Sequence, residues 1–328
     1  MSELSAAASA LAAIDGVTVL QDAPFALQTR FAIGGAAAVL CDSGEQSAFV
    51  NAFSIVQERE LPFVVISGGS NLVVSDAGFE GVALRFSGAR ISQEGERIEV
   101  EAGAVLQHLV DFTIDRGLEG MQTLTGIPGN VGGAIYGNAG AYGHSMEEIV
   151  ERVTFTDGSS IRHFVNEECQ FRYRESIFKE RKDWVILSAQ LRLHEGDPLD
   201  LRKEADEIRP IRDKKYPPTM KCAGSIFKNV FLADLPQRAQ AEVPPNLVRD
   251  GKVPSAWFLE QTGVKGMRRG DIQVAPYHAN LIYNDGHGTA MDLVAVIEEL
   301  KRRVKDRFGF ELEEEVQYVG FDLAGVVK

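Results

Sequence analysis

Two glycine-rich segments in the first half of the chain have the composition of loops that approach a ligand closely. The first is Ser67–Asn71 (Ser-Gly-Gly-Ser-Asn), which follows a β-branched run. Gly68 and Gly69 permit positive φ and close backbone contact, while Ser70 and Asn71 add hydroxyl and amide donors. Such donors beside exposed N–H groups suit a pyrophosphate. A plain turn between two strands has the same composition, so both interpretations stay open for this segment alone.

The second segment, Gly126–Gly143, contains seven glycines. Each would cost up to about 1 kcal/mol relative to alanine inside a helix, so the run indicates tight packing or contact with a flat or phosphorylated ligand. It lacks the G-x-G-x-x-G pattern of dinucleotide-binding βαβ units, and no Gly-Lys-Ser/Thr follows as in a P-loop. A structural loop is the alternative.

Two later segments offer catalytic side chains. In Phe171–Lys179, Arg172 and Arg174 would share one face of a strand, and arginine recognises carboxylates through two parallel hydrogen bonds; a solvated charged strand is the alternative. In Lys221–Asn229, Ser225 follows a glycine. The G-x-S-x-G elbow of acyl-enzyme hydrolases is missing, so Ser225 is a candidate hydroxyl proton donor, although a serine beside a glycine is usually structural.

Leu312–Gly320 contains three consecutive glutamates before a β-branched run. Such a run is most often a solvated strand edge. Alternation along a strand would nevertheless turn Glu313 and Glu315 to one side and Glu314 to the other, which allows one inward carboxylate.

The histidines and cysteines do not have metal-ligand spacing. His278, just before a predicted strand, is kept as a possible binding residue. Three scattered cysteines fit a reducing cytoplasm without a disulfide framework. The Ala-rich stretch Ser5–Ile14 is predicted to be a helix, since a signal peptide would have a basic segment before it.

The bulk composition limits the class of protein. A length of 328 residues favours two or three domains. The net charge of −13 argues against a nucleic-acid groove and leaves room for a local basic pocket. The apolar runs are shorter than the roughly 20 residues that span a bilayer. A cytoplasmic protein without membrane insertion is expected.

The elements that must position these residues are mixed, which predicts an α+β fold with more than one domain. Ser43 and Gln46 are predicted to form a capping box before a helix that buries Phe49, Phe53 and Val56. A helix carrying Met291–Phe308 is predicted to end at Gly309. Strands are predicted at 36–41, 63–66, 82–86, 98–100, 149–156, 160–164, 184–193 and 315–319, with further helices at 105–115 and 199–211.

Six ordered motifs together resemble the UDP-N-acetylenolpyruvoylglucosamine reductase (MurB) family, in its loop-lacking, type II-like subclass. They extend over roughly residues 25–320 and comprise Thr29–Gly35, Ser67–Asn71, Ile127–Gly133 with Asn138–Tyr142, Tyr173–Ser176, Gly224–Asn229 and Leu312–Val316. The chain departs from the family pattern at Val230 and Glu314, where prolines are usual, and these changes affect loop stiffness more than chemistry. The short stretch between Leu193 and Arg209 leaves no room for a tyrosine-bearing loop.

The resemblance implies a three-domain α+β protein. Its FAD-binding part would be of the vanillyl-alcohol-oxidase (PCMH) type in two subdomains, followed by an α+β substrate domain. The expected boundaries are 1–88, with 311–328 returning to it, then 89–200, and 201–310 for the substrate domain.

The resemblance also implies the site. Arg174, Ser225 and Glu315 match the family's catalytic positions. Residues expected to bind FAD are Gly68, Gly69, Ser70, Asn71, Leu72, Pro128, Gly129, Val131, Gly132, Gly133, Asn138, Gly140, Ala141, Tyr142 and Arg212. Residues expected to bind the substrate are Tyr173, Lys215, Lys228, Asn229 and His278.

The implied reaction reduces the enolpyruvyl group of a UDP-sugar, with NADPH as co-substrate and FAD as carrier. Hydride from flavin N5 would reach the terminal carbon of the enol ether. Arg174 and a protonated Glu315 would stabilise the resulting enolate, and Ser225 would donate the proton. The product would be UDP-N-acetylmuramate, and a monomer is expected. An FAD-dependent oxidase on the same scaffold and a non-catalytic nucleotide-binding module are the alternatives.

Overall fold

The computed structural model describes residues 3–321, and the chain divides into two compact units. Unit 1 comprises Met1–Ala23, Ala37–Gly69 and Glu80–Pro217, and unit 2 comprises Pro24–Ala36, Ser70–Phe79 and Pro218–Lys328. Residues 1–2 and 322–328, which the predicted domains include, lie outside the described residues. Each unit is built from segments far apart in the sequence, and the chain passes from one to the other inside the Ser67–Asn71 motif.

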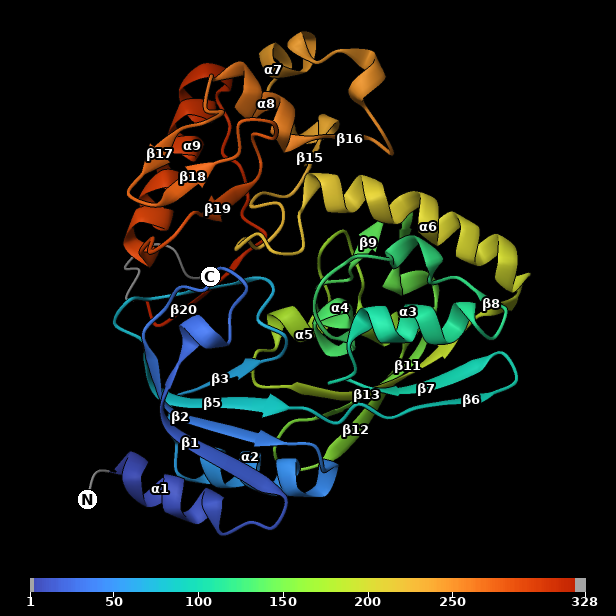
Figure 1. The fold of residues 1–328 in the computed structure, drawn as a ribbon, viewed down its shortest axis with the longest axis vertical. Helices are drawn as coiled ribbons and strands as arrows, with labels where there is room; N and C mark the ends of the chain where they lie inside the picture. The colour runs from blue at the N-terminus through green and yellow to red at the C-terminus, as the bar shows by residue number, and fades with distance from the viewer. Residues whose placement is uncertain (1–2, 322–328) are drawn as a thin grey trace. The chain divides into compact units, whose positions relative to one another are not determined.

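Unit 1 contains two larger sheets (Figure 1). One has the strand order β1-β2-β5-β3, with β3 and β5 parallel, and the other is the antiparallel sheet β12-β11-β13-β7-β6. The strands are β1 (Val17–Pro24), β2 (Ala36–Ser43), β3 (Phe63–Ile66), β5 (Phe79–Phe86), β6 (Ile91–Glu94), β7 (Arg97–Glu101), β11 (Val150–Thr156), β12 (Ile161–Val165) and β13 (Val185–Arg192). Short pairs join β8 (Leu118–Glu119) to β14 (His194–Glu195) and β9 (Gly140–Ala141) to β10 (His144–Ser145).

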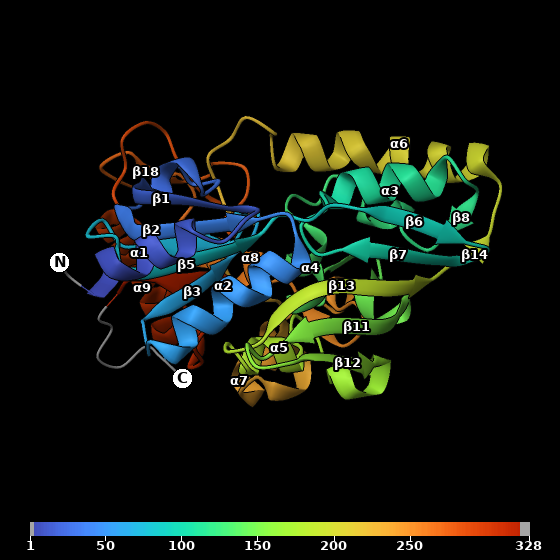
Figure 2. The same ribbon diagram turned by 90° about the horizontal axis from the view of Figure 1, so that it is seen from below.

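The helices of unit 1 bury apolar faces, as their sequence periods predict. Helix α2 lies along the four-stranded sheet (Figure 2). The ring of Phe49 packs against that of Phe86 with ring centres 5.5 Å apart, and the ring of Phe53 packs edge-on against that of Phe63 with ring centres 5.1 Å apart. Full burial of such a side chain is worth about 1.5–3 kcal/mol. The helices are α1 (Glu3–Ala12), α2 (Gln46–Glu58), α3 (Leu106–Ile114), α4 (Val131–Tyr136), α5 (Ile177–Glu180) and α6 (Pro198–Lys215).

Unit 2 is organised around α9 (Ala290–Phe308), which begins at a Thr289 cap and ends at Gly309 in the left-handed region, as predicted. Phe258 packs on Phe308 with ring centres 5.2 Å apart. Strand β20 runs parallel to β4. The elements are β4 (Leu72–Val74), β15 (Val230–Phe231), β16 (Lys252–Val253), β17 (Arg268–Arg269), β18 (Ile272–Val274), β19 (Ile282–Asn284), β20 (Gln317–Val319), α7 (Gln237–Glu242) and α8 (Ser255–Gln261).

The mixed content confirms the predicted α+β class, and the predicted strands and helices are present with ends shifted by a few residues. Two local expectations differ from the structure. The capping box at Ser43 is wrong, because Glu45 is the N-cap residue and Ser43 Oγ donates to Gly16 O at 2.8 Å. Helix α6 runs past the expected end at Ile211 to Lys215, with Pro210 inside it.

Within residues 3–321, no helix has the length and apolar character needed to cross a membrane. The same part of the chain contains no cluster of side chains that could hold a metal ion. Cys41, Cys169 and Cys222 are buried free thiols.

Candidate active site

The two glycine-rich segments meet inside unit 1. A Cβ on Gly68 would lie 3.2 Å from Gly129 Cα and 3.0 Å from Asn130 Oδ1, so a side chain there would require these neighbours to shift by a few tenths of an ångström. Gly132 N donates to Ala102 O at 2.8 Å and anchors the start of α4. A Cβ on Gly133, in contrast, would meet no described atom within 4 Å. The backbone is therefore closely packed at Gly68 and Gly132, whereas Gly133 of α4 is exposed and faces open space.

Helices α3 and α6, which lie side by side in both ribbon views, hold the start of the second glycine segment (Figures 1 and 2). Gln107 Oε1, on α3, accepts hydrogen bonds from Gly126 N at 2.7 Å and from Thr125 Oγ1 at 3.3 Å. From α6, Arg212 Nε lies 3.3 Å from the position of a Cβ on Gly126. Arg212 thus lies at the segment predicted to bind FAD. Gln107 was missed, since nothing in its local sequence distinguishes it.

Arg174 occupies a tight turn, so the predicted strand with two arginines on one face is wrong. Arg172 and Glu175 exchange two backbone hydrogen bonds of 3.0 Å, and Arg174 between them has φ = 60°. Its Nη2 donates to Gly140 O at 2.9 Å. Lys179 Nζ donates to Arg174 O at 3.0 Å and to Glu175 Oε1 at 2.9 Å. The turn, held by Lys179, thus brings the predicted catalytic arginine against the second glycine segment.

Other predicted positions of unit 1 lie around this turn with different degrees of exposure. The Asn138 side chain is buried and bonded within the protein, donating to Arg172 O at 3.0 Å and accepting from Glu147 N at 3.0 Å. Tyr142 is half exposed with φ = 55°. The Tyr173 ring centre lies 5.3 Å from the Arg174 guanidinium. Because the side-chain amide of Asn138 is already bonded within the protein, an FAD contact by Asn138 would have to use its backbone.

Tyr136 of α4 is a partly buried phenol next to this turn. Burial, reinforced by the Glu175 charge, raises the pKa of Tyr136 to about 12. Its carbonyl accepts a 2.7 Å hydrogen bond from the buried Ser176 hydroxyl. Tyr136 therefore stays protonated at neutral pH, and Ser176 of the Tyr173–Ser176 motif has an anchoring role.

In unit 2, backbone pairing brings the Ser225 segment beside the glutamate segment. Ile226 N donates to Asn280 O at 3.1 Å, and Glu315 N donates to Ile226 O at 2.7 Å. Asn71 Nδ2 donates to Glu315 O at 2.7 Å. Ser225 and Glu315, predicted from segments far apart in the sequence, thus lie on neighbouring stretches of chain. The Asn71 amide has a structural use here, and its role towards FAD stays a prediction.

The three glutamates have different surroundings. Lys228 Nζ, on a buried side chain, forms an ion pair with Glu313, whose side chain is 72% exposed. Glu314 is only 10% exposed and pairs with Lys301 Nζ of α9 at 2.8 Å. The two side chains thus have different partners, as the predicted alternation requires of Glu313 and Glu314, and the side of Glu315 stays a prediction. The solvated-edge interpretation holds for Glu313 and is wrong for Glu314.

Asn280 is a second residue that the sequence did not reveal. It is 2% exposed, its Oδ1 accepts from Phe227 N at 2.9 Å, and its Nδ2 donates to Phe227 O and to Ser255 Oγ, both at 2.9 Å. The buried amide therefore fixes the segment that carries Ser225. His278, two residues before it, donates from its backbone N to Ala275 O at 3.3 Å.

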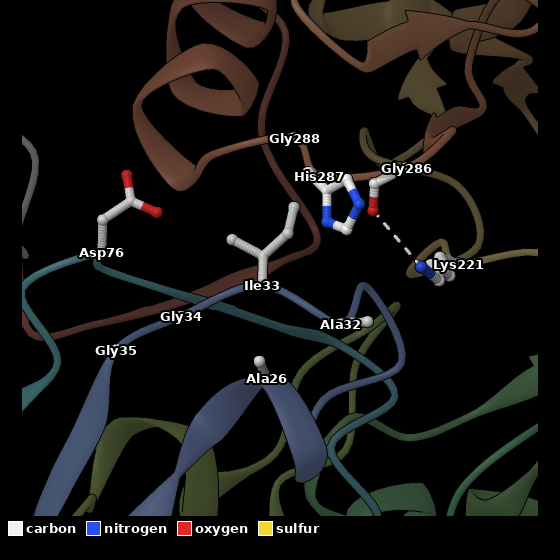
Figure 3. Close-up of a pocket in the computed structure, with 10 residues that line it drawn as sticks. All are labelled: Ala26, Ala32, Ile33, Gly34, Gly35, Asp76, Lys221, Gly286, His287 and Gly288. Atoms are coloured by element: carbon white, nitrogen blue, oxygen red, sulfur yellow. Dashed lines mark hydrogen bonds between the residues drawn. The ribbon is translucent and has the colours of Figure 1, made fainter.

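The Thr29–Gly35 motif packs within unit 2 and lines a hollow of about 360 Å³ (Figure 3). A Cβ on Gly35 would lie 2.4 Å from Asp76 O, which explains the glycine by close packing. The charged groups of the wall serve the fold: Asp76 accepts from the first N–H groups of α9 at 2.8 and 3.1 Å, and Lys221 donates to Gly286 O at 3.3 Å. This motif is explained by packing.

Comparison with known proteins agrees with this arrangement. Residues 36–161 match an FAD binding domain profile, and residues 216–319 match the C-terminal domain of UDP-N-acetylenolpyruvoylglucosamine reductase. The chain is 54% identical to the UDP-N-acetylenolpyruvoylglucosamine reductase of Solibacter usitatus over 94% of this chain and 99% of that one, and 36% identical to that of Rubrobacter xylanophilus over 91% and 94%.

A solved structure is similar over the same range. The crystal structure of UDP-N-acetylenolpyruvylglucosamine reductase (MurB) from Thermus caldophilus aligns with a TM-score of 0.72 at 28% identity, covering 92% of this chain and 98% of that one. Sequence relatives and this structure thus agree over nearly the full length. The chain belongs to the UDP-N-acetylenolpyruvoylglucosamine reductase family, as its six motifs predicted.

Proposed function

We propose that this protein reduces the enolpyruvyl group of UDP-N-acetylglucosamine enolpyruvate to give UDP-N-acetylmuramate, a peptidoglycan precursor, with NADPH as reductant and FAD as carrier. The observation that carries this proposal is the junction of the two glycine segments with Arg174. The second glycine segment and a positioned guanidinium are joined there by the 2.9 Å bond from Arg174 Nη2 to Gly140 O.

The residues of unit 1 fit FAD by two observations. Open space at Gly133 lies beside a backbone that is closely packed at Gly68 and Gly132. Arg212 adds a cation at Gly126, which suits a phosphorylated ligand. We assign the pyrophosphate to the turn at Gly68–Leu72 and the isoalloxazine to the Pro128–Tyr142 segment.

The catalytic roles are carried over from the family motifs and suit the chemistry of the side chains. Bound FAD supplies the redox step by accepting hydride from NADPH and passing it to the enol ether. Arg174 stabilises the negative charge that develops on the substrate carboxylate, and a protonated Glu315 donates a hydrogen bond to the same group. Ser225 delivers a proton to the adjacent carbon. Lys215, Lys228, Asn229, Tyr173 and His278 are assigned to substrate binding.

An anaerobic spectral titration tests the proposal. The purified protein should be yellow, lose its flavin absorbance on addition of NADPH, and regain it on addition of UDP-N-acetylglucosamine enolpyruvate without oxygen. A colourless protein would favour a nucleotide-binding module. Rapid reoxidation by oxygen, with no response to the enolpyruvyl substrate, would favour an FAD-dependent oxidase.

We further propose the three-domain division predicted from the sequence, with two FAD-binding subdomains and a substrate domain at 201–310. A cytoplasmic monomer that binds NADPH and a UDP-sugar, and neither nucleic acid nor membrane, is proposed with it. The acidic net charge of −13 supports the lack of nucleic-acid binding. Sedimentation of the purified chain tests the monomer.

A further inference from the structure

Glu313, Glu314 and Glu315 are chemically identical, yet only one is assigned to catalysis. In a strand, a slip of one residue turns every side chain to the opposite face. Leu312 and Val316 are 2% and 4% exposed, and Glu314 lies between them on the same face by alternation. Glu314 is therefore the middle position of the buried face of this segment, and it bears a charge there.

The buried carboxylate of Glu314 has two partners in unit 2. Lys301 Nζ, on a side chain 20% exposed, lies 2.8 Å from Glu314 Oε1. The second is the Tyr318 phenol, whose pKa is raised by burial and then by the charge of Glu314 and hydrogen bonding to it. The other carboxylate on Lys301 is Glu298, one turn earlier on α9, at 3.3 Å with a side chain 54% exposed. The Glu314 pair is thus the buried half of a network whose other half faces solvent.

The electrostatics of this network agree with its geometry. Burial lowers the pKa of Lys301, but the hydrogen bond and charge of Glu314, with those of Glu298, more than offset this and raise it. Burial and the Glu314 charge also raise the pKa of Tyr318. Lysine therefore stays charged and the phenol stays protonated, so both remain donors to Glu314.

The backbone on either side of Glu314 belongs to the candidate site. Lys228 N donates to Glu313 O at 2.9 Å, and Glu315 N donates to Ile226 O at 2.7 Å. A displacement of the Glu314 backbone would therefore also displace Glu315, the next residue. It would also displace the Ser225 segment, which is joined to Glu315 by a backbone hydrogen bond. Buried ion pairs are best attested as devices that fix register.

We propose that Glu314 is a positioning residue, which, through Lys301 and Tyr318, holds the Leu312–Val316 segment against α9 so that Glu315 is presented to the substrate. This inference rests on the proposed function. Its role differs from fold stability alone, because it predicts a defect confined to the half-reaction in which Glu315 acts. NADPH oxidation by the flavin does not involve Glu315 and should be spared.

The test compares Glu314→Gln, Lys301→Gln and the double variant with Glu298→Gln, which removes only the exposed partner of the same lysine. Each holoenzyme is reduced anaerobically by NADPH and reoxidised by UDP-N-acetylglucosamine enolpyruvate at saturation. Both single variants should slow reoxidation at least tenfold, with flavin reduction and substrate KM changed less than twofold. The double variant should be no slower than the worse single variant, because coupled residues are non-additive. Glu298→Gln should match the wild type.

The proposal would be overturned if the reoxidation rate of Glu314→Gln were within twofold of that of Glu298→Gln. It would also be overturned if both half-reactions slowed equally, or if the losses of the single variants added up in the double variant. If a single variant fails to fold because a buried charge has lost its partner, the double variant still decides, since it carries two neutral amides and must be slow in reoxidation only. Failure of the wild type to be reoxidised by the substrate would instead refute the proposed function.

Discussion

Lys179 holds the turn that carries Arg174 and allows the predicted role of that turn to be tested. Arg174 has φ = 60°, a region that costs a residue other than glycine roughly 1–2 kcal/mol. Lys179 Nζ holds the turn through Arg174 O at 3.0 Å and Glu175 Oε1 at 2.9 Å, and its side chain is 14% exposed. Hydrogen bonds from charged groups contribute about 1.5–3 kcal/mol, enough to offset this backbone strain.

Lys179→Met removes that contribution while keeping a long apolar stem. Since 1.4 kcal/mol is roughly a tenfold change, the fraction of molecules with Arg174 in place should fall about 10- to 100-fold. The paired backbone bonds between Arg172 and Glu175 and the Arg174–Gly140 bond remain, so we expect the lower end of this range.

The assay is stopped-flow reoxidation of the reduced flavin by the enolpyruvyl substrate, with NADPH reduction of the same sample as an internal reference. Lys182→Met, an exposed lysine three residues on, is the matched control. Reoxidation should fall about tenfold for Lys179→Met only. The reasoning would be refuted if Lys179→Met kept more than half the wild-type rate, or if reduction by NADPH fell in parallel.

Three further variants test separate parts of the structure. Ser225→Ala should slow reoxidation by about 10²–10⁴-fold and leave flavin reduction intact; equal loss in both steps would reject the proton-donor role. Gly68→Val should release FAD, since its Cβ would crowd Gly129 Cα at 3.2 Å; retention of full yellow colour by the folded variant would contradict the loop assignment. Arg302 and Arg303 hold the pKa of Glu299 down to about 2, so its stabilising contribution is present above pH 4.5 and lost towards pH 2. Because these side chains are largely exposed, Glu299→Gln should cost no more than about 1 kcal/mol at neutral pH, and thermal melts of variant and wild type should converge as the pH falls through that window.

The sequence alone was sufficient for the family, the α+β class and most elements, because these depend on local periodicity and on motif order. Phe49 and Phe53 repeat at helical spacing and pack as predicted, and Gly309 ends α9. The glycine segments were selected by their glycine content, although Gly132 and Gly133 lie inside the short helix α4, contrary to the expectation that such a run avoids helix interiors. The assignments of Arg174, Ser225 and Glu315 came from the family motifs and stay predictions.

The tertiary structure decided what depends on partners distant in the sequence. Alternating Arg and aromatic residues favoured a strand at Arg172–Arg174, but Lys179 and the Gly140 carbonyl stabilise a left-handed turn there. Gln107 and Asn280 have ordinary local sequences and acquire their roles only because Gly126 N and Phe227 N are brought to them. The residue type alone could not distinguish the roles of Glu313, Glu314 and Glu315. Glu313 meets Lys228 at the surface and Glu314 meets Lys301 in the interior, because burial and a partner from α9 are properties of the folded chain.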